Sequence, residues 1–107
     1  MDFYTIGSRE IVLAFKLTGI EGTVAETRTE VLEAFNRFTK QSDLPEDQKP
    51  RILILTEDAA VLIEKEEYEW QKTGKYPLVV EVPGLNGHAE GRKSLSEAIR
   101  HAVGISV

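Results

Sequence analysis

An unbroken apolar run at residues 52–55, Ile-Leu-Ile-Leu, constrains the fold of this chain more than any other stretch. Consecutive apolar residues, half of them β-branched, are typical of a strand that is covered on both faces. The run ends at Thr56, Glu57 and Asp58, where the threonine is placed to cap a helix and the two acids fall in its positive first turn. The stretch therefore predicts a buried strand that leads directly into a helix, as in a parallel βαβ unit.

The flanking segments alternate between the two kinds of element. Strand-like composition is found at residues 2–6, 23–26 and 77–82, and the second of these is short enough for an edge strand. Helices are predicted between the strands: the first follows Ser8 as its N-cap, and the others begin at residues 27 and 57. Short helical connections favour parallel strands with right-handed crossovers. We therefore expect an α/β fold of the CheY/Rossmann-like kind, with a four-stranded parallel sheet in the order 2-1-3-4.

The three helices differ in their apolar surface. Only Lys16 interrupts the apolar residues of 11–17, so we expect that helix to be deeply covered. Thr27 and Glu30 have the spacing of a capping box at the start of the second helix. Its apolar face is formed by Val31, Leu32, Phe35 and Phe38.

The third helix is predicted to run without a break from Glu57 to Thr73. Its six carboxylates between residues 57 and 69, against one lysine, are interpreted as a solvated face. Tyr68 and Trp70 project in different directions on a helix, so at least one of them is expected to lie off the core. For Trp70 a core position and an interface position both remain open.

Composition narrows the class of protein. A chain of 107 residues with 41% hydrophobic residues suits one compact domain. No apolar run approaches the roughly 18 residues that span a bilayer, and no signal peptide follows Met1, so we expect a cytoplasmic protein without membrane insertion. The absence of cysteine excludes disulfides and thiolate sites, and the net charge of −5 argues against nucleic acid as a partner.

The sequence offers no catalytic or cofactor-binding constellation. Residues 7–9, Gly-Ser-Arg, carry neither the closely spaced glycines of a phosphate loop nor the acids that would hold Mg²⁺ beside Asp58. His88 and His101 lack partners at metal-ligand spacing. We therefore expect no catalytic, metal or cofactor site, and we interpret residues 56–58 as the start of a helix.

The amino-acid composition changes after the fourth predicted strand. One proline and three glycines in residues 83–91 indicate a flexible hinge, and Ser94 and Glu97 again have capping-box spacing. A narrow apolar stripe follows at helical spacing: Leu95, Ala98, Ile99, Ala102 and Val103. We divide the chain into an α/β core (1–83), a hinge (84–93) and a C-terminal helix with a tail (94–107).

The stripe suits docking in the groove of a partner, or packing on the chain's own sheet, and both remain open. In the first case the apolar residues form the contact and the cations lie at its rim, where they affect the rate of association. The candidate partner-binding residues are Arg92, Leu95, Ile99, Arg100, Ala102 and Val103.

Four stretches resemble the F subunit of the V-type/A-type rotary ATPases of bacteria and archaea. They are IGSREIVLAFKLTGI (6–20), ILILTED (52–58), GKYPLVVEVPG (74–84) and IRHAVGI (99–105), and they occur in the expected order along nearly the whole chain. Two departures are Glu67, at an apolar position of the third helix, and the long loop at residues 41–50.

The resemblance implies a non-catalytic rotor subunit of the central stalk, without cofactors and peripheral to the membrane. It implies binding to the coiled-coil D subunit, with the ring of A and B subunits and the membrane-side stalk subunit of the C/d type as neighbours. Such a subunit helps to couple ATP hydrolysis or synthesis to ion translocation. The alternative is a receiver-like or small-ligand-binding α/β domain that uses the strand ends near Asp58.

Overall fold

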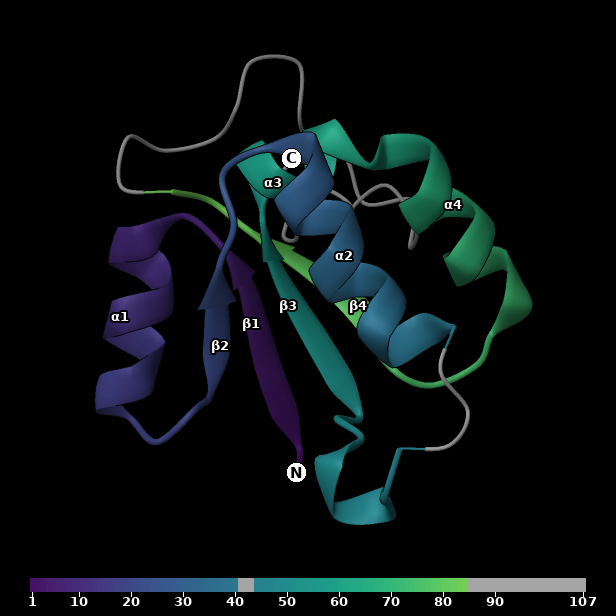
Figure 1. Ribbon diagram of the computed structural model, residues 1–107, viewed down its shortest axis with the longest axis horizontal. Helices are drawn as coiled ribbons and strands as arrows, with labels where there is room; N and C mark the ends of the chain where they lie inside the picture. The colour runs from purple at the N-terminus through teal and green to yellow at the C-terminus, as the bar shows by residue number, and fades with distance from the viewer. Residues whose placement is uncertain (41–43, 85–107) are drawn as a thin grey trace, which may run out of the picture.

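The computed structural model describes residues 1–40 and 44–84. The elements follow in the order β1 (Phe3–Gly7), α1 (Arg9–Leu17), β2 (Gly22–Val24), α2 (Arg28–Thr39), a 3-10 turn (Glu46–Gln48), β3 (Ile52–Thr56), α3 (Glu57–Leu62), α4 (Glu64–Thr73) and β4 (Leu78–Val82). The four strands form one parallel sheet in the order β2-β1-β3-β4 (Figure 1). The predicted α/β fold and strand order are confirmed, with β1 and β3 in the centre.

The hydrophobic core lies between one face of the sheet and the helices α2, α3 and α4. Alternate residues of the strands point to this face, because side chains on a strand alternate between its two sides. The core cluster consists of Tyr4, Ile6, Ala25, Val31, Phe35, Phe38, Leu53, Leu55, Ala59, Ala60 and Ile63. Half-buried Leu32, Trp70 and Val79 pack against it. The predicted apolar face of the second helix is therefore confirmed.

Helix α1 packs on the opposite face, and the prediction that it is deeply covered is wrong. Val12 is its only buried residue, and it lies near Thr5 and Gly22 of β1 and β2. Leu13 is exposed, and Leu17 is 90% exposed. A single helix beside an edge strand can turn only one side to the sheet, and no described element covers its outer side.

The third predicted helix is two helices, α3 and α4, separated at Ile63 (φ −126°, ψ 34°). The break leaves the carbonyl of Leu62 without its bond to the fourth residue ahead. The guanidinium of Arg28 donates to that carbonyl at 2.7 Å and forms an ion pair with Glu66, also at 2.7 Å. This partner from the start of α2 stabilises the break. The hydrogen bond that Arg28 donates to the Glu66 carboxylate also holds the pKa of Glu66 below its usual range.

The interpretation of the acidic stretch as a solvated face is wrong for two residues. Glu57 and Glu67 are only 2% and 3% exposed, although Asp58, Glu64 and Glu69 are exposed as expected. Glu67 follows the buried Ile63 by one helical turn, and its N–H donates to the carbonyl of Ile63 at 2.8 Å, so its side chain falls on the inward side.

Tyr68 and Trp70 lie on different sides of α4, as predicted. Tyr68 is exposed, whereas Trp70 is half-buried and packs against the core. The indole Nε1 of Trp70 donates a hydrogen bond to the carbonyl of Pro77 at 2.8 Å. Trp70 therefore packs against the core and also stays partly accessible at the surface.

The predicted capping box at the start of α2 is confirmed. Thr27 Oγ1 accepts from the backbone N–H of Glu30 at 3.2 Å. Glu30 Oε1 in return accepts from the N–H of Thr27 at 3.2 Å and from that of Glu26 at 3.1 Å. These bonds stabilise the charged carboxylate and lower the pKa of Glu30. The bond from the N–H of Glu26 contributes most to the shift.

Glu30→Gln is expected to destabilise the protein at neutral pH and to change the acid limb of its stability profile. A carboxylate with a lowered folded-state pKa contributes fully above its ordinary pKa of 4.5, and the contribution is lost as the pH falls through the folded-state value. Urea unfolding from neutral to acidic pH measures this, and the difference between wild type and variant should shrink below about pH 4.5. Glu33→Gln, on the exposed side of the same helix, is the matched control. A difference that stays constant with pH would contradict the assignment.

Candidate functional site

The carboxyl ends of β1 and β3 form the crevice in which doubly wound sheets usually bind ligands. In this chain the fully buried side chain of Thr56 lies between the ends of these two strands. Its Oγ1 accepts a hydrogen bond from the backbone N–H of Ser8 at 3.2 Å. A Cβ atom added to Gly7 would lie only 2.0 Å from the same Oγ1. The two central strands are thus tied together where a ligand would enter.

The prediction that residues 56–58 begin a helix is confirmed, with one change. Thr56 and Ser8 occupy the positions that precede α3 and α1, but neither side chain caps its helix. The Thr56 hydroxyl is instead engaged by the backbone of Ser8, which lies on the neighbouring strand connection. Asp58 is exposed in the first turn of α3, where a negative charge is favourable.

Within residues 1–40 and 44–84, no group of three or more histidine, cysteine, aspartate or glutamate side chains could hold a metal ion. The same part of the chain has no helix that is long and apolar enough to cross a membrane. His88 and His101 lie outside the described residues.

The residues predicted to bind a partner also lie outside the described part. These are Arg92, Leu95, Ile99, Arg100, Ala102 and Val103. The predicted hinge at residues 84–93, apart from Gly84, and the helix at 94–107 lie outside it too. All of them therefore stay predictions.

An apolar surface that sequence reasoning missed lies on the face of the sheet opposite the core. The strand registers align Phe3 with Ile52 and Ile52 with Leu78, in a row across β1, β3 and β4. Phe3 is 41% and Leu78 47% exposed. Val80 and Val82 continue the same face along β4 and are half-buried. We call these five residues the outer face.

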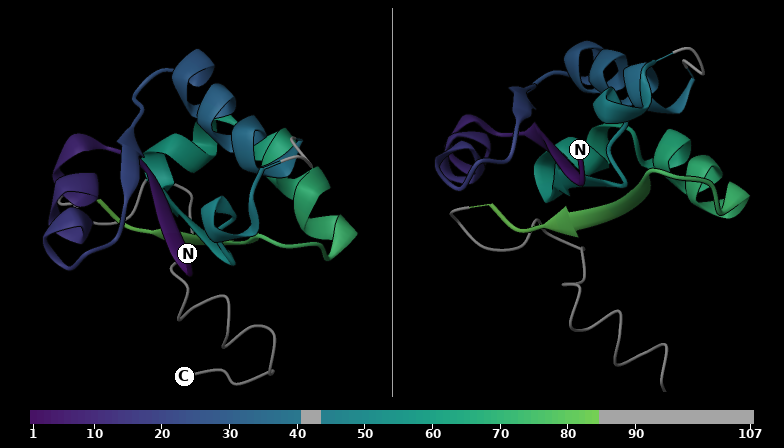
Figure 2. Two further views of the ribbon diagram at one scale, coloured as in Figure 1. Left: turned by 60° about the horizontal axis from the view of Figure 1, so that its bottom comes forward. Right: turned by 90° about the horizontal axis from the view of Figure 1, so that it is seen from below.

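No described helix lies over β4 on the outer face (Figure 2). Helix α1 packs against β1 and β2, near the edge of the sheet opposite β4. The remaining helices pack on the core side. Exposed aromatic and aliphatic side chains in one row are a typical contact surface for another polypeptide. The alternation between the two faces is hidden in the sequence of residues 78–82, because valines occupy both sides of the strand.

Comparison with known proteins shows the family of the chain. The family described as ATP synthase (F/14-kDa) subunit matches residues 4–99 of the chain. Relatives named as the F subunit of A-type ATP synthase are 28% identical in Thermococcus kodakarensis over 107 residues and 27% identical in Thermococcus gammatolerans over 107 residues. A third, from Thermococcus sibiricus, is 25% identical over 109 residues. Each alignment covers 100% of this chain and 98% of the relative. The chain belongs to the family of ATP synthase (F/14-kDa) subunits.

Proposed function

We propose that this protein is the non-catalytic F subunit of the central stalk of an A-type or V-type ATPase. The observation that carries the proposal is the match along the whole chain to F subunits of A-type ATP synthases, at nearly their full length. In this role the protein binds the coiled-coil D subunit and turns with it inside the ring of A and B subunits. It thereby helps to couple ATP hydrolysis or synthesis to ion translocation.

The crevice between β1 and β3 supports a non-catalytic role. Thr56 occupies the position where a receiver domain or a nucleotide-binding domain would admit its ligand, and Gly7 approaches it too closely for any larger side chain. The sheet instead serves as a stiff body, since all its strands are parallel and the two central ones are bonded on both sides. A stiff body suits a subunit that transmits torque.

Two apolar surfaces are available for the contact with the D subunit. One is the outer face, and the other is the stripe of Leu95, Ile99 and Val103 predicted from the sequence. Full burial of each stripe residue would contribute roughly 1.5–3 kcal/mol. The neighbouring Arg92 and Arg100 would lie at the rim and act mainly on the rate of association. In the assembly, the A/B ring and the membrane-side C/d-type stalk subunit are the further neighbours, on the cytoplasmic side of the membrane.

Co-expression with the D subunit tests the proposal. We expect the two chains to purify as an equimolar complex that survives size-exclusion chromatography, because the apolar surfaces above are removed from water on assembly. An unrelated antiparallel coiled coil of similar length is the control. If the chain elutes alone in the presence of the D subunit under native conditions, the proposal fails.

Removal of residues 84–107 is expected to leave a folded domain. The core cluster is made of residues 4–63, with Val79 and Trp70 packed against it, and the truncation keeps all of these residues. A cooperative thermal transition close to that of the full chain is the expected result in calorimetry. Loss of cooperative unfolding would instead identify the last segment as a part of the core, and the division into core, hinge and helix would be wrong.

A further inference from the structure

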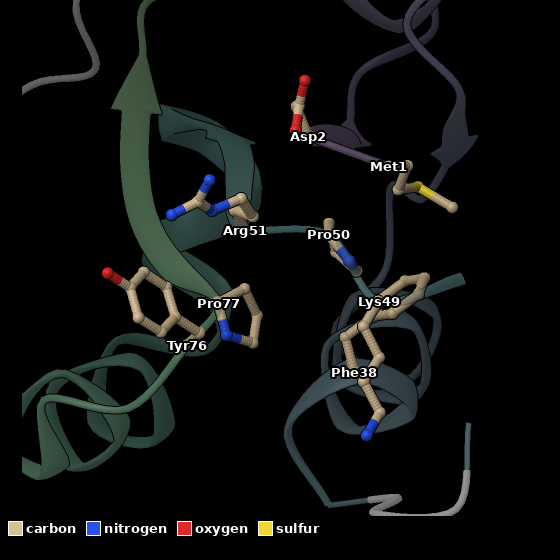
Figure 3. A pocket seen from close by; sticks show the side chains of 8 residues that line it. All are labelled: Met1, Asp2, Phe38, Lys49, Pro50, Arg51, Tyr76 and Pro77. Carbon is tan, nitrogen blue, oxygen red and sulfur yellow. The ribbon is translucent and has the colours of Figure 1, made fainter. Parts of the chain in front are cut away.

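Two adjoining hollows lie at the amino end of the sheet, far from the crevice closed by Thr56. One has a volume of about 530 Å³ and the other of about 250 Å³. They adjoin because Phe38, Lys49 and Tyr76 line both of them. Figure 3 shows the larger one, with Tyr76, Pro77 and Arg51 together at one wall and Phe38 and Lys49 at the other. We call the two together the amino-end hollow.

Aromatic side chains form part of the surface of the amino-end hollow. The ring of Phe38 is buried, and its centroid lies 4.6 Å from that of Tyr4. Trp70 is held by its hydrogen bond to the carbonyl of Pro77. Tyr76 is 63% exposed, with the guanidinium of Arg51 at 5.8 Å from its ring centre. Aromatic surfaces with little remaining freedom are preferred anchors in protein interfaces.

Positive charge surrounds these rings. Lys40, Lys49, Arg51 and Lys75 line the amino-end hollow, whereas Asp2 is the one carboxylate among its described lining residues. This concentration of cations stands out in a chain of net charge −5. Lys40 and Lys75 follow the C-termini of α2 and α4, where cations favour the helix dipole. That reason does not apply to Lys49 or Arg51, which precede β3, so helix stability alone does not explain the cluster.

A groove between α2 and α4 continues the amino-end hollow. Its volume is about 250 Å³, and Thr39, Lys40 and Trp70 line both it and the hollow. Asn36 also lines the groove, and its buried Oδ1 has no hydrogen-bond partner in the described part of the chain.

The groove is less positively charged than the hollow. Lys40, Glu66 and Glu69 line the groove, and Glu66 is already paired with Arg28, whereas Lys40, Lys49, Arg51 and Lys75 line the hollow. A strand of nucleic acid, with a phosphate at every residue, would meet one lysine and the carboxylate of Glu69 along the groove. A polypeptide can match both parts, because its charge varies along its length.

We propose that the groove and the amino-end hollow bind an acidic segment of a partner protein. Its apolar side chains lie on Trp70 and Tyr76, and its carboxylates pair with Lys40, Lys75 and their neighbours at the rim. This surface shares no residue with the outer face or with the predicted stripe at residues 95–103. The chain then contacts two polypeptides at once, one through each surface.

Trp70 provides a direct test, because it is the only tryptophan of the chain and lines both the groove and the smaller part of the amino-end hollow. The probe is a short acidic peptide that begins with leucine and phenylalanine and continues with a run of glutamates. The control is the same peptide with lysines in place of the glutamates. The acidic peptide is expected to change the fluorescence of the full chain saturably, with an affinity that falls as salt is added. No saturable change with the acidic peptide, or equal changes with both, overturns the proposal.

Charge reversal then locates the binding site. Lys40→Glu/Lys75→Glu is expected to weaken binding of the acidic peptide about tenfold, because each reversal replaces an attraction at the rim by a repulsion. Lys16→Glu/Lys65→Glu makes the same change in net charge at exposed positions outside the hollow, and its effect should be small. Equal losses in the two variants would mean that only net charge matters and would refute the site.

Inorganic phosphate and duplex RNA complete the experiment. Neither is expected to change the Trp70 fluorescence in the way the acidic peptide does. If either does so, and Lys40→Glu/Lys75→Glu removes the effect, the hollow is a site for phosphate groups and the proposal of an acidic polypeptide is wrong. Failure of this proposal leaves binding to the D subunit untouched, because the surfaces are different.

Discussion

Gly7→Ala is expected to lower the free energy of unfolding by about 3 kcal/mol or more, one of the largest effects for a single methyl group in this chain. Gly7 has a φ of 150°, a conformation that alanine adopts only with strain. The added Cβ would also lie 2.0 Å from Thr56 Oγ1 and 2.7 Å from its Cγ2. Relief of this contact would displace the end of β1 from β3 and break the hydrogen bond from Ser8 to Thr56. Urea unfolding followed by circular dichroism measures the loss.

Two further variants separate backbone strain from the close contact. Gly19 also has a positive φ, of 92°, but a Cβ there would meet nothing within 4 Å. Gly19→Ala should therefore lose only about 1 kcal/mol. Gly7→Ala/Thr56→Ala removes the two nearest atoms of the threonine and should recover part of the stability lost in Gly7→Ala. If Gly7→Ala is no more destabilising than Gly19→Ala, the crevice is less tightly closed than its geometry indicates.

The fold could be predicted because its main signals are local. The apolar run at residues 52–55 is confirmed as the central strand β3, and Thr27 and Glu30 form the capping box that their spacing indicates. Strand order follows from the short helical connections, since right-handed crossovers leave few arrangements of four parallel strands. Each of these inferences needs only residues that are close in the sequence.

The wrong predictions share a dependence on distant partners. Arg28 stabilises the break between α3 and α4 through the carbonyl of Leu62, 34 residues away. Thr56 bonds to Ser8, 48 residues away, instead of capping its own helix. No spacing rule identifies such pairs. The exposure of Leu17 has a related cause, because the apolar composition of a helix does not tell how many neighbours it has.

The candidate surfaces were missed for the same reason. Lys40, Lys49, Arg51 and Lys75 show no periodicity, and only the fold gathers them around Phe38 and Tyr76. The sequence did contain one signal for the cluster. The four cations lie next to the segments that lead into the third and fourth strands, and in a parallel sheet these segments meet at the amino end. The outer face had no such cue, because β4 is apolar on both of its sides.

Leu95→Ala/Ile99→Ala is expected to weaken binding to the D subunit by about a hundredfold or more. Full burial of each side chain contributes roughly 1.5–3 kcal/mol, and every 1.4 kcal/mol corresponds to a factor of ten. Titration calorimetry with the purified D subunit gives the dissociation constants. His101→Ala is the matched control, since residue 101 lies off the predicted apolar stripe and its replacement should leave the affinity nearly unchanged.

The same variant decides between the two positions proposed for the stripe. If the stripe packs on the outer face of its own sheet in the isolated protein, it covers Phe3 and Leu78, and Leu95→Ala/Ile99→Ala lowers the free energy of unfolding of the isolated chain. If the stripe contacts only the D subunit, the isolated chain unfolds at the same urea concentration as the wild type, and the loss appears in the dissociation constant alone. An unchanged affinity for the D subunit would exclude the stripe as the contact. The outer face would then be the surface to alter next, through Phe3→Asp and Leu78→Asp, because both residues are exposed and their replacement leaves the core intact.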